Sequence, residues 1–156
     1  MGIQKFPSMQ LARACAARDR RREKALCFVV QGERLLVFDH VGVPDAGVQL
    51  PAGGVEPGES PAEAAVRELW EESGLRLSAP VHLLSYEWRR QLPERLTHQV
   101  CHAFAFRAPD GLPETWTHPA DGEVFQYRWA PLDRPALDWD MDTALPALWH
   151  HLQESV

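Results

Sequence analysis

The sequence has 156 residues, of which 45% are hydrophobic and 24% are charged, and its formal net charge is −6. This composition is typical of one globular domain and excludes a largely disordered chain, because disorder combines low hydrophobicity with high net charge. No uncharged apolar run approaches the roughly 20 residues that span a bilayer, so we expect no membrane partner. The negative charge argues against polymeric nucleic acid as the partner, since phosphates require a basic surface.

The N-terminal segment differs in charge from the rest of the chain. Residues 1–24 contain seven Lys or Arg and two acidic residues, whereas residues 25–156 contain nine and twenty, which gives +5 and −11. Residues 9–24 are rich in Ala and Arg, which favours a helix. We therefore predict an N-terminal basic helical extension over residues 1–24 and the main domain over residues 25–156.

A β-hairpin is predicted next. Residues 25–31 form an apolar, β-branched run, Gly32 and Glu33 form a turn signal, and residues 34–40 form a second run. A loop that contains Gly and Pro follows, and it leads to a short strand predicted over residues 48–50.

The clearest helix in the sequence begins after Ser60. Ser60 can cap its first turn, Pro61 suits its first position, and Glu63 completes a Ser-x-x-Glu capping box. We expect the helix to run to about residue 72 and to end at Gly74, because glycine tolerates the left-handed conformation at a helix end.

The remaining elements are mostly strands. Residues 81–90 and 98–107 are predicted to be strands, a polar loop follows through residues 110–119, and residues 124–130 form a further strand. Residues 142–153 carry leucine and tryptophan at helical spacing, which predicts a terminal helix. The fold class is therefore mixed α/β.

The predicted central helix gathers three glutamates on one side. Glu68, Glu71 and Glu72 fall within about 100° of arc, and like charges at this spacing repel one another. They lie near the helix C-terminus, where the helix dipole disfavours negative charge, and they follow a loop whose Gly53 and Gly54 allow close approach of the backbone. Carboxylate and carbonyl oxygens suit Mg²⁺ or Mn²⁺, so the pattern predicts a divalent metal site rather than a solvated acidic face.

The segment GGVEPGESPAEAAVRELWEESGL resembles the signature of the Nudix hydrolases, Gx5Ex7REUxEExGU, in which U is an aliphatic residue. All nine specified positions are filled, by Gly53, Glu59, Arg67, Glu68, Leu69, Glu71, Glu72, Gly74 and Leu75. The order of the predicted elements across most of residues 25–156 is also similar. The resemblance implies the family's α/β/α sandwich, with a mixed central sheet and a catalytic loop and helix.

The resemblance also implies a metal-dependent reaction. In the family, the glutamates that match Glu68 and Glu72 bind the essential divalent cation, and the one that matches Glu71 often binds a further ion. The backbone carbonyl of Ala52 is expected to be another ligand, with Mg²⁺ or Mn²⁺ as the cofactor. The implied reaction is hydrolysis of a nucleoside diphosphate linked to another group, in which water attacks phosphorus and a carboxylate acts as general base.

The general base is left open between two parts of the sequence. Glu71 is a candidate within the motif, where Glu72 is also expected to be catalytic, and Glu123 is a candidate in a later loop, where many family members carry an additional acidic residue. Asp121 is a weaker competitor for the same role.

Other motif positions are expected to shape the site. Gly53, Glu59, Arg67 and Gly74 match positions that mostly orient the loop and the helix. Because Glu63 and Arg67 form a favourable pair four residues apart, a structural Arg67 and a phosphate-contacting Arg67 both remain open.

The substrate-binding residues remain unassigned, and the substrate is expected to be a small nucleotide. Pro93 lies too far beyond the motif for the spacing associated with ADP-ribose, and Tyr86 lies too early for the spacing associated with dinucleoside polyphosphates. Two tryptophans, Trp88 and Trp116, could stack on a base, and three arginines, Arg89, Arg90 and Arg95, could contact phosphates. Core packing or incidental exposure is the alternative explanation for each of them.

Two other functions are carried as alternatives. One is a ligand-binding or regulatory module without turnover, although such modules usually lose some of the glutamates that are intact here. The other is a hydrolase of RNA 5′ ends that uses residues 1–24 as a basic arm. A homodimer with contacts through the N-terminal helix is compatible with the family. We expect a cytoplasmic location, because the start lacks a secretion signal and the odd, widely spaced Cys15, Cys27 and Cys101 fit no disulfide framework.

Overall fold

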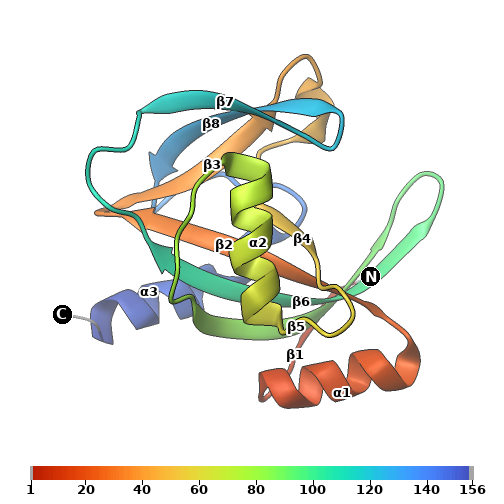
Figure 1. Cartoon of the computed structure of the whole chain (residues 1–156). Coiled ribbons are helices and arrows are strands. Elements are labelled where there is room, and N and C mark those ends of the chain that lie inside the picture. Colours follow the sequence, from red (N-terminus) through yellow and green to blue (C-terminus); the bar gives the residue numbers. More distant parts are fainter. Residues whose placement is uncertain (1, 155–156) are drawn as a thin grey trace.

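One mixed eight-stranded sheet forms the centre of the structure, a computed structural model that describes residues 2–154. The strands follow the order β1-β5-β6-β2-β3-β8-β7, and β4 pairs with β2 beside this path. β2 and β6 are parallel and the other pairs are antiparallel (Figure 1), which confirms the mixed α/β prediction. The strands span Gly2–Lys5 (β1), Arg22–Gln31 (β2), Arg34–His40 (β3), Ala52–Gly54 (β4), Val81–Gln91 (β5), Leu96–Arg107 (β6), Thr115–Ala120 (β7) and Glu123–Pro131 (β8).

Three helices pack on this sheet within the described residues. They span Met9–Asp19 (α1), Pro61–Ser73 (α2) and Leu145–Glu154 (α3), with 3₁₀ turns at Pro44–Ala46 and Met141–Ala144. α2 lies over the face of the sheet that is turned to the viewer in Figure 1. None of the helices among the described residues combines the length and the apolar character needed to cross a membrane.

The central strand β2 separates two hydrophobic cores. Its odd-numbered residues, such as Cys27 and Val29, pack in the core that contains Leu69 of α2. Its even-numbered residues, such as Phe28, pack in the core that contains Leu148 of α3. Successive side chains of a strand point to opposite faces, so one continuous apolar run supplies both cores.

The N-terminal segment differs from the prediction in two ways. α1 ends at Asp19 instead of running to residue 24, because Arg20 adopts a left-handed conformation with φ 55° and its N–H donates to the carbonyl of Ala16. From Arg22 the chain joins the parallel ladder with β6, which overrides the local helix preference. β1 is absent from the sequence-based prediction; it pairs with the edge of β5. β2 therefore runs across the expected boundary after residue 24, and the division into extension and domain stays a prediction.

Two further strands also differ from the sequence-based prediction. The short strand expected over residues 48–50 is a single bridge from Gln49 to Phe38, and the paired strand is Ala52–Gly54 instead. The loop predicted through residues 110–119 contains β7, which forms a hairpin with β8. Asp121 and Gly122 connect the two strands with φ of 52° and 76°. Positive φ at both positions is typical of the tight type I′ turn that suits the twist of a hairpin.

The cysteines are free, as expected for a protein without a disulfide framework. Cys27 and Cys101 are buried, and Cys15 is half-buried on α1.

Candidate functional site

The site is built where β2 and β3 separate. These strands pair only at their hairpin end, at Val30 with Leu35 and Gln31 with Arg34. The start of β2 pairs with β4 instead, so β4 and the loop after it lie against β2 while β3 turns toward β8. This separation leaves an opening in the sheet, and the C-terminal half of α2 faces it.

A cavity of about 330 Å³ occupies this opening. The four expected metal ligands line it, together with Asp121 and Glu123 from the β7–β8 hairpin. The complete lining is Arg22, Lys24, Phe38, His40, Gln49, Leu50, Ala52, Gly53, Gly54, Glu68, Glu71, Glu72, Asp121, Glu123 and Phe125. The fold therefore brings residues of β2, β3, β4, β8 and α2 to one place.

α2 begins and ends as the sequence predicted. The Ser60 side chain accepts from the N–H of Glu63, and the Glu63 side chain accepts from the N–H of Ser60, which completes the capping box. Gly74 ends the helix with φ 82°, and its N–H donates to the carbonyl of Trp70. These local signals fix the length of the helix and hence which residues of its last two turns face the cavity.

Glu72 is the most deeply buried acidic residue of the site, with 8% of its surface exposed. Its Oε1 accepts a hydrogen bond of 3.0 Å from the N–H of Ala52, and its backbone carbonyl accepts one of 2.9 Å from the Tyr127 hydroxyl. Burial raises the pKa of Glu72 to about 8, and the nearby charges of Glu68 and Asp121 act in the same direction. The N–H of Ala52 partly offsets this shift because it favours the ionised carboxylate.

Glu68 lies one turn earlier and packs directly over Gly53 of β4. A Cβ atom at Gly53 would lie 2.0 Å from the carboxyl carbon of Glu68, so any side chain at position 53 would displace this carboxylate. Burial raises the pKa of Glu68, and the hydrogen bond of 2.7 Å from Arg67 Nη1 opposes the rise. The motif glycine is therefore required by the close approach of Glu68.

Arg67 has a structural set of partners. Its Nε and Nη2 donate to the two carboxylate oxygens of Glu59 at 2.8 and 2.9 Å, and Nη2 also donates to the carbonyl of Gly54 at 2.8 Å. These hydrogen bonds raise the pKa of Arg67 and lower that of Glu59. The expected pair between Glu63 and Arg67 is absent among the described residues, because the Glu63 carboxylate is used in the capping box. Arg67 therefore ties α2 to the loop that precedes it.

Two half-exposed acidic residues border the cavity from different elements. Glu71 is about half exposed on α2, and its Oε2 accepts from Arg67 Nη1 at 3.1 Å. Glu123 is the first residue of β8 and is also about half exposed. Both candidates for the general base thus border the same space.

Sequence reasoning missed two basic residues of this site, Arg22 and Lys24. They lie two residues apart on β2 and therefore on the same face, but the sequence places them at the end of a predicted helix. A Cβ atom at Gly54 would lie 3.1 Å from Arg22 Nη2, so the guanidinium of Arg22 extends over Gly54 of β4. Lys24 is half-buried, and burial lowers its pKa. These cations make the cavity suitable for an anionic ligand despite its carboxylates.

The donor set fits a divalent cation by its chemistry. Glu68 and Glu72 are hard oxygen donors whose charges are unfavourable where they are buried, and the carbonyl of Ala52 borders the same cavity. As the side chains lie, no group of three His, Cys, Asp or Glu among residues 2–154 is gathered closely enough to hold an ion. Glu68 is turned to Arg67 and Glu72 to the N–H of Ala52, so coordination requires these carboxylates to reorient.

The aromatic and basic candidates for substrate contacts lie outside this cavity. Trp88 is 9% exposed and donates to Asp140, while Trp116 stacks on Tyr127 and donates to the carbonyl of Ser73. Both tryptophans therefore pack within the fold. The three arginines considered for phosphate contacts do not line the cavity either: Arg89, Arg90 and Arg95.

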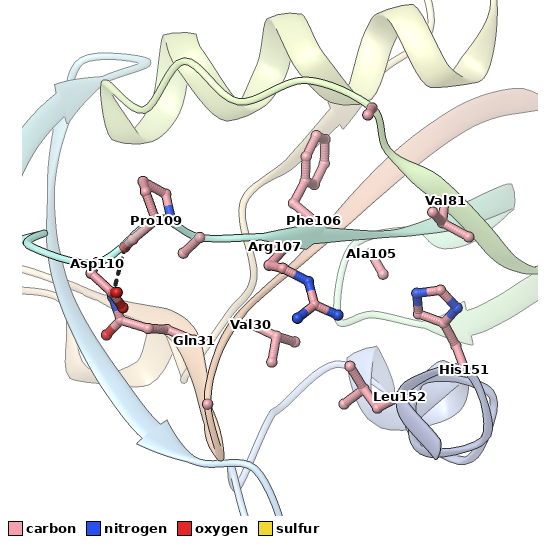
Figure 2. Close-up of a pocket in the computed structure, with 13 residues that line it drawn as sticks. Val30, Gln31, Val81, Ala105, Phe106, Arg107, Pro109, Asp110, His151 and Leu152 are labelled. Atoms are coloured by element: carbon pink, nitrogen blue, oxygen red, sulfur yellow. Dashed lines mark hydrogen bonds between the residues drawn. The ribbon is translucent and has the colours of Figure 1, made fainter. Parts of the chain in front are cut away.

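A larger cavity, of about 580 Å³, lies away from the carboxylates (Figure 2). It lies where the ends of β2 and β6 meet α3, and Arg107 and His151 project into it beside Leu152. Within the part of the chain that the structure describes, Asp110 is the only carboxylate in its lining. The side chain of Gln31 closes one end by donating to the carbonyl of Pro109 at 2.8 Å. The described lining therefore lacks the acidic set that metal-assisted chemistry requires.

Comparisons with known proteins agree on one family. A family model described as NUDIX domain matches residues 20–148 of this chain. The 8-oxo-dGDP phosphatase NUDT18 of Mus musculus is 36% identical over 118 residues, which cover 71% of this chain but 34% of that protein, so the chain spans about a third of this relative's length. An RNA pyrophosphohydrolase of Bradyrhizobium sp. (strain ORS 278) is 30% identical over 145 residues, which cover 92% of this chain and 74% of the relative. The crystal structure of a MutT NUDIX hydrolase from Burkholderia pseudomallei has the same fold, with a TM-score of 0.66 and 22% identity over 82% of this chain and 98% of that one.

Proposed function

The chain belongs to the NUDIX family, and we propose that it is a pyrophosphohydrolase that uses Mg²⁺ or Mn²⁺ to cleave a nucleoside diphosphate linked to another group. One observation carries the proposal. Glu68, Glu71 and Glu72, the three glutamates of the motif that lie on α2, border a single cavity of about 330 Å³, which also contains two basic side chains. This combination suits a polyanionic substrate that is bound together with a cation.

We assign the metal to Glu68, Glu72 and the carbonyl of Ala52, with Glu71 as a ligand for a further ion. When bound, the cation neutralises phosphate oxygens and lowers the pKa of a water molecule. The contacts of Glu72 with the N–H of Ala52 and of Glu68 with Gly53 keep both carboxylates at the cavity, where they would reorient to coordinate the cation. Glu59 and Arg67 keep the loop and the helix together, so both carboxylates stay on the same side of the cavity.

The other residues of the cavity have roles in binding and proton transfer. Arg22 and Lys24 are placed to attract the phosphate groups of the substrate, since both border the cavity from β2. The proton of the attacking water passes to a carboxylate. Glu71 and Glu123 are the exposed candidates for that general base, whereas Glu72 is buried and hydrogen-bonded.

The test is turnover of a nucleotide panel by the full chain. The panel contains ADP-ribose, nucleotide sugars, dinucleoside polyphosphates, NADH, coenzyme A, and normal and oxidised nucleoside triphosphates, each with Mg²⁺, Mn²⁺ or EDTA. We expect one class to be hydrolysed rapidly with the metal and not with EDTA. A panel without turnover, while calorimetry shows that the metal and a nucleotide bind, would instead support a binding module without catalysis.

A hydrolase of RNA 5′ ends is the second candidate. It is supported by the similarity to an RNA pyrophosphohydrolase and by the exposed Arg20 and Arg21, which directly precede Arg22 at the cavity. Removal of residues 1–24 is an unsuitable test, because it deletes β1 and the start of β2. The better comparison is Arg20→Ala with Arg21→Ala, assayed on a 5′-triphosphorylated oligonucleotide and on the matching nucleoside triphosphate. Loss of activity on the oligonucleotide alone would favour RNA.

Two further expectations stay predictions. The homodimer with contacts through α1 can be checked by light scattering of the purified chain. The cytoplasmic location can be checked by fractionation of cells.

A further inference from the structure

His40 and Glu123 form a pair that borders the cavity from β3 and β8. Nε2 of His40 is 3.0 Å from Oε2 of Glu123. The two atoms lie within ion-pair distance, and the carboxylate oxygen is the acceptor toward the ring nitrogen. The two side chains border the same cavity as Glu68 and Glu72. The motif does not include His40, and sequence reasoning gave it no role.

The strand register explains how this pair forms. His40 is the last residue of β3 and lies opposite Phe125 of β8. Glu123 precedes Phe125 by two residues, so it lies on the same face of the sheet as a diagonal neighbour of His40, within reach of a long side chain. The turn at Asp121 and Gly122 fixes where β8 begins, and the N–H of Val41 continues the ladder by donating to the carbonyl of Val124.

The environment of His40 is better suited to an apolar ring than to an imidazole. The His40 side chain is 10% exposed, and its ring packs edge-on against Phe125 and tilted against Phe38, at centroid distances of 4.6 and 5.5 Å. Its Nδ1 is buried and has no hydrogen-bond partner among the described residues. A buried unpaired nitrogen is unfavourable, because it gives up its hydrogen bond with water and gains none in the protein. Packing alone therefore favours Phe at this position, and the contact with Glu123 is what His40 adds.

That contact matters because Glu123 has little else to hold it. Its side chain is 46% exposed, and among the described residues His40 is the partner with which it forms an ion pair. Without this contact, the carboxylate of a residue next to a tight turn samples several rotamers and spends less time directed into the cavity.

We propose that Glu123 is the general base and that His40 is the positioning residue that directs its carboxylate toward the attacking water. In this step the water oxygen forms a bond to phosphorus, and its proton passes to Glu123. The bridging P–O bond breaks, and the leaving group departs with that oxygen and the electron pair. The inference rests on the proposed pyrophosphohydrolase function and assigns a residue to it from outside the motif.

The experiment measures kcat and KM for the best substrate of the panel in four variants. His40→Phe keeps the aromatic packing and removes the donor, whereas His40→Gln keeps an N–H donor near the position of Nε2. Glu123→Gln removes the base, and the double variant combines it with His40→Phe. We expect Glu123→Gln to lower kcat by about 100-fold or more, which is the usual contribution of a general base. His40→Phe should lower kcat at least tenfold with KM changed less than threefold, and His40→Gln should recover most of the loss.

The double variant and a matched control separate positioning from a loss of stability. If His40 acts through Glu123, His40→Phe has no further effect in the background of Glu123→Gln. His98 forms a similar pair with Glu87 on β5 and β6, away from the cavity, so His98→Phe should leave kcat within twofold of the wild type. His40→Phe should unfold at a temperature no lower than the wild type, because it removes the unpaired nitrogen.

The outcomes distinguish this inference from the function on which it rests. Two results overturn the positioning role. One is a wild-type kcat in His40→Phe. The other is that His40→Phe lowers kcat by the same factor in the wild type and in the background of Glu123→Gln. Wild-type kcat in Glu123→Gln overturns the general base, while a metal-dependent wild-type activity still supports the pyrophosphohydrolase. A wild-type protein that hydrolyses no member of the panel overturns both.

Discussion

Replacement of Glu72 by Gln is expected to stabilise the metal-free protein at pH 8 while it abolishes turnover. Gln has nearly the same volume and keeps an oxygen that accepts from the N–H of Ala52, so the fold around it is preserved. It removes a charge that is unfavourable in the buried site, and it also removes an expected metal ligand. The same change should therefore raise stability and lower activity.

The size of the effect follows from the pKa of Glu72, which burial raises from 4.5 to about 8. Between these values the folded protein holds a proton that the unfolded chain has released, so the free energy of unfolding decreases as the pH rises through this window. At about 1.36 kcal/mol for each pKa unit, the wild type loses about 4 kcal/mol between pH 4.5 and pH 8 through this group. The amide in the Glu72→Gln variant cannot ionise, and this part of the pH dependence disappears.

The assay is urea unfolding of both proteins at pH 5 and pH 8, with EDTA or with saturating Mg²⁺. In EDTA, the two should be similar at pH 5, and the variant should be more stable at pH 8 by a few kcal/mol. Mg²⁺ should restore the wild type at pH 8 and have little effect on the variant. Equal pH dependence in EDTA would refute the argument from burial, and wild-type turnover by the variant under saturating Mg²⁺ would refute its role as a metal ligand.

Three other substitutions test the architecture of the site. Gly53→Ala should lower kcat at least tenfold with little change in melting temperature, because its Cβ displaces only the Glu68 carboxylate; a rate near that of the wild type contradicts this close approach. Arg67→Lys removes the two-point contact with Glu59 and should lower the free energy of unfolding by about 1–3 kcal/mol in urea titrations, whereas an unchanged midpoint would mean that the contact is dispensable. Gly74→Ala places a side chain at φ 82° and should destabilise the protein by about 1 kcal/mol in thermal unfolding without a change in KM, and an altered KM would show that this residue also shapes the site.

The central helix and its acidic face could be predicted from the sequence because their determinants are local. Ser60 and Glu63 cap the helix three residues apart, and Gly74 ends it through its own backbone conformation. The spacing of Glu68 and Glu72 puts both carboxylates on one side of any helix that contains them. Resemblance to the family motif predicted the roles of Glu68 and Glu72, and the fold places both residues at one cavity.

The part of the site that β2, β3 and β8 contribute could not be predicted in the same way. The sequence predicts a helix for Arg22 and Lys24 because their neighbours have high helix propensity, yet the parallel ladder with β6 makes them strand residues. His40 meets Glu123 only because β3 pairs with β8 in one particular register. A single sequence carries the periodicity of each strand and not the register between strands.

The sequence by itself therefore determined the capped helix, the positions of most strands along the chain and the acidic motif, since each depends on residues a few positions apart. The tertiary structure decided which carboxylates are buried, which basic side chains face them and how Glu123 is held. The physical reason is that burial, pKa and hydrogen-bond partners depend on neighbours brought together by strand pairing. Glu72 illustrates the difference: its position on α2 is local, whereas its pKa of about 8 results from burial, which the N–H of Ala52 on β4 partly offsets.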